Sequence, residues 1–281
     1  MALISIIISL MLDHAFRHLH HLRDLSWFER YTQKLGSLIS TENNWLKIAL
    51  VLALPILLIA LLQLALFNIL WGVPVFLLSI PVLFYCLGPD CLINDIEAYL
   101  DARSLGDDEE ALHYAGVLTG RSASSSPDQQ TTDVTRAILN AANERVFSVL
   151  FWFVLLGPLG AVIYRLTAHL GQQEEETQDL RDTATLIQSA MAWAPARILA
   201  IGYALTGHFD GAVSAYQSRP HEDNIALANY DVLITTGLGA LRHQQVSDEI
   251  SCIRSARSLV TRSILIWVAM LALLTLGGWL G

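Results

Sequence analysis

Residues 46–67 read LKIALVLALPILLIALLQLALF, an apolar run that only Lys47 at its edge and Gln63 interrupt. A helix rises about 1.5 Å per residue, so this run is long enough to span a hydrocarbon core about 30 Å thick. A second apolar run follows at residues 68–87. Because the two runs adjoin, they predict a tight transmembrane hairpin over residues 46–87.

Further apolar runs lie at residues 146–166 and 259–280, with a weaker one at 190–207. Charged residues make up 15% of the 281-residue chain, against about 25% in an average soluble domain. These runs predict an all-α, polytopic membrane protein with four to five transmembrane or re-entrant helices. The net charge of −9 argues against a nucleic-acid partner, because phosphate binding requires a basic face.

Polar segments separate the apolar runs. In chain order we predict interfacial amphipathic helices (1–45), the transmembrane hairpin (46–87), a polar helical segment (88–145), transmembrane or re-entrant helices (146–207), a second polar helical segment (208–258) and a C-terminal transmembrane helix (259–281). Basic residues in 13–47 and in 209–258 favour the cytoplasmic side for the helical segments, by the positive-inside rule.

Glycine and proline predict where helices break. Gly157-Pro158 is expected to split the run 146–166 into two half-helices. Gly106 is expected to separate two helices, and SASSSPDQQTT at 122–132 has the composition of a disordered loop. The sequence leaves open whether 146–166 and 190–207 both cross the membrane or are both re-entrant.

Asn143-Glu144-Arg145 stands at the mouth of the apolar run that ends in Tyr164-Arg165. Snorkelling toward the headgroups is one explanation of the two arginines. An acid gains nothing from anionic headgroups, so we expect Glu144 to form a polar site with Arg145.

Arg197 lies at the centre of the run 190–207, two residues after Pro195. An arginine at the centre of a membrane helix costs about 2.5–3.5 kcal/mol, so it is expected to face a protein-lined or wet cavity and to meet an acid or an anionic ligand. The alternative is an interfacial or soluble helix with Pro195 in its first turn and Arg197 in solvent.

Charges surrounded by apolar sequence lower their burial cost by pairing. We therefore predict one cytoplasmic cleft that gathers Asp13, Glu144, Arg145, Arg165 and Arg197. In that arrangement Arg197 is the spare cation, and its planar guanidinium suits a phosphate or a carboxylate.

No metal site is predicted. His14, His18 and His21 share a helix face at ligand spacing, but an interfacial helix explains them equally well. The acids Asp107 to Glu110 suit the first turn of a helix, and the three cysteines lack zinc spacing. The chain also has no P-loop and no dinucleotide-binding or hydrolase motif.

Two blocks of sequence resemble the AmpE family, inner-membrane proteins of β-lactamase regulation that are paired with the AmpD amidase. The blocks are Asn143-Glu144-Arg145-Val146-Phe147 through Phe151-Trp152-Phe153 and Gly157-Pro158 to Tyr164-Arg165, and Trp193-Ala194-Pro195-Ala196-Arg197-Ile198 with Tyr203 to His208. The resemblance implies a multi-pass modulator in the bacterial inner membrane, with the lipid bilayer and AmpD or other cell-wall-recycling components as partners, and leaves a homodimer open. The ligand-binding residues that we predict are Asp13, Asn143, Glu144, Arg145, Tyr164, Arg165, Trp193 and Arg197.

The AmpE family is similar in turn to the CobD/CbiB adenosylcobinamide-phosphate synthases, which use ATP and Mg²⁺. After Tyr164-Arg165 those enzymes continue with an Asn-Thr-Leu-Asp-Ser-Met run, whereas this chain reads LTAHLGQQEEE. The comparison favours a modulator over an enzyme. An ATP-dependent amide-forming ligase with Mg-ATP as cofactor is the alternative, and a small-anion transporter is a third hypothesis, because broken helices and an intramembrane arginine suit one.

Overall fold

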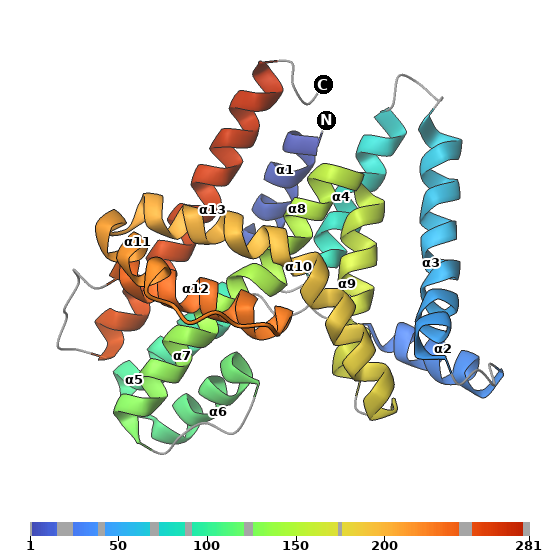
Figure 1. Ribbon diagram of the computed structural model, residues 1–281. Coiled ribbons are helices and arrows are strands. Elements are labelled where there is room, and N and C mark those ends of the chain that lie inside the picture. Colours follow the sequence, from blue (N-terminus) through green and yellow to red (C-terminus); the bar gives the residue numbers. More distant parts are fainter. Residues whose placement is uncertain are drawn as a thin grey trace. The chain divides into compact units, whose positions relative to one another are not determined.

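Every regular element in the described part of the chain is a helix (Figure 1). The structure is a computed structural model and describes residues 2–15, 25–38, 43–67, 73–87, 92–120, 126–173, 176–241 and 249–277. These residues form two compact units. Unit 1 comprises Met1–Pro89 and Ser148–Met191, and unit 2 comprises Asp90–Phe147 and Ala192–Gly281.

The helices divide between the units as follows. Unit 1 holds α1 (Ala2–Ala15), α2 (Ser26–Leu38), α3 (Asn44–Phe67), α4 (Val73–Cys86), α8 (Ser148–Leu156), α9 (Pro158–Gln172) and the first part of α10 (Gln178–Thr206). Unit 2 holds α5 (Leu92–Leu105), α6 (Asp108–Thr119), α7 (Pro127–Ala141), the π-helical turn η3 (Ala142–Phe147), the rest of α10, α11 (Phe209–Gln217), α12 (Ile225–Leu241) and α13 (Glu249–Leu276).

Among the described residues, four helical stretches are long and apolar enough to cross a membrane: Asn44–Leu66, Gln129–Leu156, Gln178–Thr206 and Ile250–Thr275. The first and last of these expose many large leucines, Leu61 and Leu273 among them. Contiguous apolar surface of this extent is unusual on a monomeric soluble protein but suits a lipid-facing helix. The predicted all-α polytopic membrane protein is therefore confirmed.

The amphipathic helix α2 packs onto unit 1 through one apolar face. Leu25 and Phe28 are buried against residues of α3, α9 and α10, while Trp27 on another face is exposed. A cluster of small and aliphatic side chains, among them Leu170 and Ala184, completes this core. The sequence predicts interfacial amphipathic helices over 1–45, and within that range the structure describes two helices, α1 (Ala2–Ala15) and the amphipathic α2 (Ser26–Leu38).

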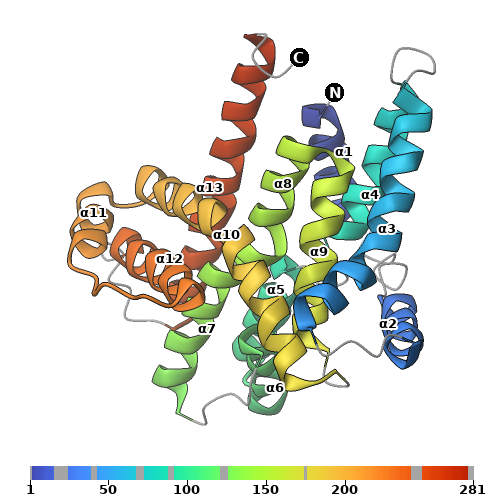
Figure 2. The ribbon, with the colours of Figure 1, turned by 45° about the vertical axis from the view of Figure 1, so that its right-hand side comes forward.

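The predicted break at Gly157-Pro158 is confirmed. Gly157 has φ 67° and ψ −154°, a conformation that side chains with a Cβ rarely adopt, and Pro158 follows as the first residue of α9. The chain reverses there, so α8 and α9 lie side by side in both views (Figures 1 and 2). The apolar run 146–166 is therefore divided between two packed helices rather than forming one continuous span.

One other expectation about helices is wrong, and so is one alternative, the first-turn position of Pro195. The loop predicted at 122–132 is helical from Pro127 onward, because Ser126 and Pro127 suit a helix start and Gln130 and Thr131 are buried in the fold. Pro195 lies well inside the 29-residue α10 and not in a first turn. The expected separation at Gly106 is confirmed, with φ 74°.

Aromatic side chains satisfy the carbonyls that two of the helix prolines leave without a donor. A proline has no N–H for the carbonyl four residues earlier. For Pro55 that carbonyl belongs to Val51, and it accepts a hydrogen bond from Tyr31 Oη at 3.1 Å. For Pro195 it belongs to Met191, and it accepts from Trp152 Nε1 at 3.1 Å. Burial raises the pKa of Tyr31, so its hydroxyl stays a donor at neutral pH.

A mutant cycle tests the first of these repairs. Tyr31→Phe should lower the free energy of unfolding by about 1–2 kcal/mol, since it leaves the Val51 carbonyl without a donor. Pro55→Ala restores a backbone N–H at position 55, so Tyr31→Phe should cost little in that background. Unfolding in mixed micelles measures both steps, and an equal Tyr31→Phe loss in the two backgrounds would contradict the pairing.

The core of unit 2 is formed by residues of α5, α6, α7, η3, α10, α11, α12 and α13. Tyr203 of α10 is fully buried there and donates to the Leu139 carbonyl of α7 at 2.8 Å. A Cβ on Gly239 of α12 would lie 2.5 Å from the Gly211 carbonyl of α11, so these helices touch through their backbones. The segment predicted to be polar, 208–258, thus contributes an apolar helix, α12, to the core.

Candidate functional site

A turn of π-helix, η3, interrupts the long helix that begins as α7 and continues as α8. A π-helical turn carries extra backbone relative to an α-helical one, usually occurs as an isolated bulge, and is frequent at functional sites. Its sequence is ANERVF, so Asn143, Glu144 and Arg145 all lie on it. The polar triad singled out from the sequence therefore occupies a distorted turn within an apolar helix.

Arg145 is held by two neighbours within unit 2. Its guanidinium donates to Asp95 Oδ2 of α5 at 3.2 Å and to the Val117 carbonyl of α6 at 3.4 Å. The side chains of Arg145 and Asp95 are only 24% and 18% exposed, so solvent screens their attraction weakly. Arg145 thus ties η3 to α5 and α6, and its ion-pair partner is Asp95 rather than the Glu144 expected from the sequence.

Glu144 has a different set of neighbours. The side chain of Asn140, one turn earlier, donates a hydrogen bond to its carboxylate, and Arg145 attracts it electrostatically. Because Arg145 is already paired with Asp95, the Glu144 carboxylate is not neutralised by a cation of its own among the described residues. A carboxylate can accept about four hydrogen bonds, so Glu144 retains capacity for a ligand donor.

Arg197 lies in the second half of α10 and is stacked on an aromatic ring. Its guanidinium carbon is 4.1 Å from the ring centroid of Trp193, and Nη1 donates to the Trp193 carbonyl at 2.8 Å. The same Nη1 donates to Asn229 Oδ1 of α12 at 2.9 Å. Among the described residues, the Arg197 side chain therefore contacts the indole of Trp193 and the amide of Asn229. The sequence predicted an acid or an anionic ligand as its partner.

A second arginine adjoins this group. Arg219, just after α11, lies over the Tyr216 ring at 4.2 Å, and its positive charge repels that of Arg197. Cation–π stacking orients a guanidinium without neutralising it. In the described part of the chain neither arginine has a carboxylate partner, so this corner of unit 2 carries two neighbouring, oriented positive charges.

The remaining predicted site residues belong to unit 1. Tyr164 is fully buried in α9, and Arg165 beside it contributes to the wall of an apolar cavity. Asp13 lies in α1, with its side chain outside the described set, as are those of His14, His18 and His21. The cleft predicted from the sequence combines residues of both units: Asp13 and Arg165 of unit 1 with Glu144, Arg145 and Arg197 of unit 2. That cleft stays a prediction.

Sequence reasoning missed four partners of these residues: Asp95, Asn140, Asn229 and Arg219. Asn229 had a readable signal, because an amide inside the apolar stretch Ile225–Leu241 needs a hydrogen-bond partner. Asp95 and Arg219 look like ordinary surface charges in the sequence. In the described residues no three His, Cys, Asp or Glu side chains gather as metal ligands, and Asp107 caps α6 by accepting from Glu110 N at 3.0 Å.

An all-helical fold with four candidate spans, and charges held on broken or distorted helices, defines a polytopic α-helical membrane protein. The family model described as "Regulatory signalling modulator protein AmpE" matches residues 1–281. This chain belongs to the AmpE family.

Curated relatives agree with that assignment and add a second group. Protein AmpE of Shigella flexneri is 24% identical over 224 residues, covering 76% of this chain and 78% of the relative. The cobalamin biosynthesis protein CobD of Chromobacterium violaceum is 29% identical over 216 residues, 69% of each chain. CobD of Stutzerimonas stutzeri is 26% identical over 167 residues, 52% of this chain and 54% of the relative. No solved structure matches the chain.

Proposed function

We propose that this protein is a multi-pass inner-membrane modulator whose signalling state responds to an anionic ligand bound between Arg197 and Arg219. The family assignment supports the modulator role. The observation that carries the ligand class is the pair of stacked arginines, which lack a carboxylate partner among the described residues.

The physical case for an anion rests on charge balance. Two guanidinium groups that repel each other stabilise a bound phosphate or carboxylate more than either would alone, and each can bind it through a bidentate fork. Trp193 and Tyr216 hold the forks in place, so little side-chain entropy is lost on binding. Asn229 accepts from Nη1 of Arg197, which leaves the other donors of that guanidinium for the ligand.

The resemblance to the AmpE family suggests the biological setting of this ligand. Carboxylate-bearing fragments of the cell wall are suitable anions, and the AmpD amidase and β-lactamase induction are the proposed partner and output. Loss of the site should then alter inducible β-lactamase as deletion of the whole gene does.

Binding titrations test the proposal. Purified protein in detergent is titrated calorimetrically with inorganic phosphate, a carboxylate-bearing muropeptide and Mg-ATP. Arg197→Gln and Arg219→Gln should each weaken binding of the favoured anion by about tenfold or more, the factor for a lost charged hydrogen bond. Arg262→Gln is the matched control, since Arg262 donates to the Ser258 carbonyl of its own helix, α13. An affinity that neither Arg197→Gln nor Arg219→Gln changes would contradict the site.

A second candidate function is an enzyme of the cobinamide-phosphate synthase type. The two CobD relatives and the Glu144 carboxylate on the π-helical turn favour it. The same titration separates the two candidates. Mg-ATP binding that is abolished by Glu144→Gln but retained in Arg219→Gln supports the enzyme, whereas anion binding that depends on both arginines supports the modulator.

A further inference from the structure

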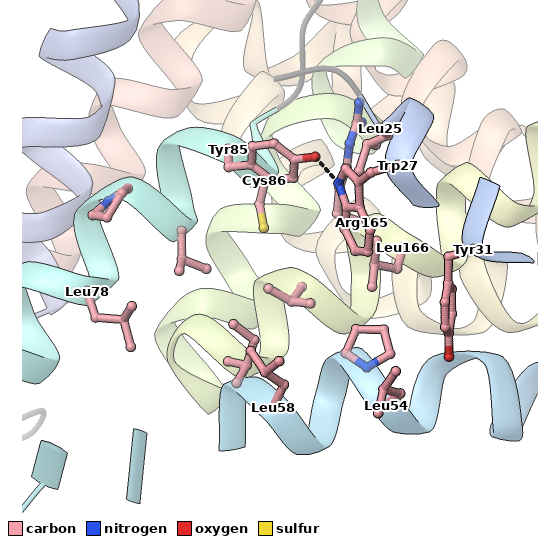
Figure 3. Close-up of a pocket in the computed structure, with 15 residues that line it drawn as sticks. Leu25, Trp27, Tyr31, Leu54, Leu58, Leu78, Tyr85, Cys86, Arg165 and Leu166 are labelled. Atoms are coloured by element: carbon pink, nitrogen blue, oxygen red, sulfur yellow. Dashed lines mark hydrogen bonds between the residues drawn. The ribbon is translucent and has the colours of Figure 1, made fainter. Parts of the chain in front are cut away.

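Unit 1 has an open-sided cavity of about 530 Å³ between α2, α3, α4 and α9 (Figure 3). This volume is within the range of ligand pockets in proteins, about 300–1,000 Å³. The walls are almost wholly apolar, with Leu54 and Leu58 from α3 and Leu78 from α4. We propose that this cavity binds one chain of an anionic membrane phospholipid, with the lipid headgroup beside Arg165.

The chemistry of the cavity is different at its two ends. Arg165 and the Trp27–Tyr85 pair, in which the indole N–H donates to the tyrosine oxygen, lie together at one end in Figure 3. Leu58 and Leu78 lie away from them. An arginine has five N–H donors, so Arg165 can keep a protein partner and, once its side chain turns toward the cavity, donate to a phosphate oxygen. A ligand that matches both ends has an anionic head and a hydrocarbon tail.

The depth of the cavity matches one leaflet. Its α3 residues begin at Leu54 and end at Ile59, and Lys47 marks the start of the apolar run on the same helix. At about 1.5 Å per residue these walls lie roughly 10–18 Å along α3 from Lys47. Half of a hydrocarbon core is about 15 Å thick, so a tail from one leaflet reaches this depth.

The cavity also opens toward the side from which a lipid would come. Leu54 and Leu58 line it, yet each exposes more than half of its surface. They belong to the leucine-rich, lipid-facing surface of α3. A phospholipid chain can therefore enter sideways from the bilayer, while its headgroup stays at the level of the interfacial helix α2.

Native mass spectrometry of the full chain, released from detergent after incubation with phosphatidylglycerol or phosphatidylcholine, tests the proposal. Wild type should retain phosphatidylglycerol at least about tenfold better than phosphatidylcholine, the factor for one charged hydrogen bond. Leu58→Trp should fill the entrance and reduce retention of both lipids. Leu61→Trp is its matched control, because Leu61 lies on the same helix, is 57% exposed where Leu58 is 60% exposed, and does not line the cavity.

Arg165→Gln tests the headgroup contact and should equalise the two lipids without abolishing retention. Retention in Leu58→Trp equal to that in Leu61→Trp overturns the cavity as the binding site. An unchanged preference for phosphatidylglycerol in Arg165→Gln overturns the role of the arginine. Leu58→Trp and Arg165→Gln leave Arg197 and Arg219 unchanged. The anion titration of unit 2 therefore tests the proposed function independently of the lipid measurement.

Discussion

Gly160→Ala is expected to unpack the α8–α9 hairpin. A Cβ at this position would lie 2.3 Å from the Trp152 carbonyl oxygen and 2.8 Å from Leu156 Cβ. Neither obstacle is the end of a flexible side chain, so the helices must separate to admit the methyl group. Overpacking of a core costs about 1–3 kcal/mol and occasionally more, and a clash with backbone belongs at the upper end of that range. Thermal unfolding in detergent, with the yield of monodisperse protein, measures the loss.

Gly36→Ala is the control for that experiment. Its Cβ would come no closer than 3.9 Å to the nearest atom outside its own helix neighbourhood, Lys47 Nζ at the end of a long side chain. Alanine favours a helix over glycine by about 1 kcal/mol, so this variant should be as stable as wild type or slightly more so. Similar unfolding temperatures for the two alanine variants would mean that α8 and α9 are not in backbone contact at Gly160.

Asp95→Asn should destabilise unit 2 by about 2–3 kcal/mol, because it leaves the Arg145 guanidinium largely buried without its carboxylate. Removing one partner of a fully buried pair costs about 3–5 kcal/mol, and the partial exposure of these side chains lowers that figure. Adding Arg145→Gln should recover part of the loss, since two amides can hydrogen-bond without an uncompensated charge. The free energy of unfolding of the two single variants and the double variant gives the coupling.

The matched control for that cycle is the ion pair of Arg103 with Asp108. The distance from Arg103 Nη1 to Asp108 Oδ1, 2.8 Å, is shorter than that of the Arg145–Asp95 pair, but the Asp108 side chain is 87% exposed. Exposed pairs contribute about 0–1 kcal/mol, so Asp108→Asn should change stability little. If Asp95→Asn were no more costly than Asp108→Asn, burial would not be what makes the Arg145 pair strong.

The length of the apolar runs was sufficient to predict the membrane class, and glycine and proline were sufficient to predict the breaks at Gly157 and Gly106. These features depend on local properties: apolar length and backbone conformations that only glycine adopts readily. The start of α7 was missed because its serine-rich composition resembles a loop, while burial of Gln130 and Thr131 depends on the rest of unit 2. The passage of α10 through Pro195 depends on Trp152, a donor that is distant in the sequence.

The charged residues of the candidate site could be predicted from the sequence, but their partners could not. Glu144, Arg145 and Arg197 are conspicuous because charge in apolar sequence is costly. Their partners are brought near only by folding: Asp95 is 50 residues from Arg145, and Asn229 is 32 residues from Arg197. The orientation of Arg219 over Tyr216 leaves no trace in hydropathy, although it decides where the unpaired positive charge collects.

The reversal at Gly157 has a consequence for assigning sides of the membrane. A hydropathy count registers residues 146–166 as one crossing, yet the chain turns back on itself inside that run. Counting a turn as a crossing changes the parity of the count, and every segment after it is then assigned to the opposite compartment. Reporter fusions placed only beyond α9 do not show how many times residues 146–166 cross the membrane. Two fusions, one before α8 and one after α9, show whether the chain leaves this run on the side from which it entered.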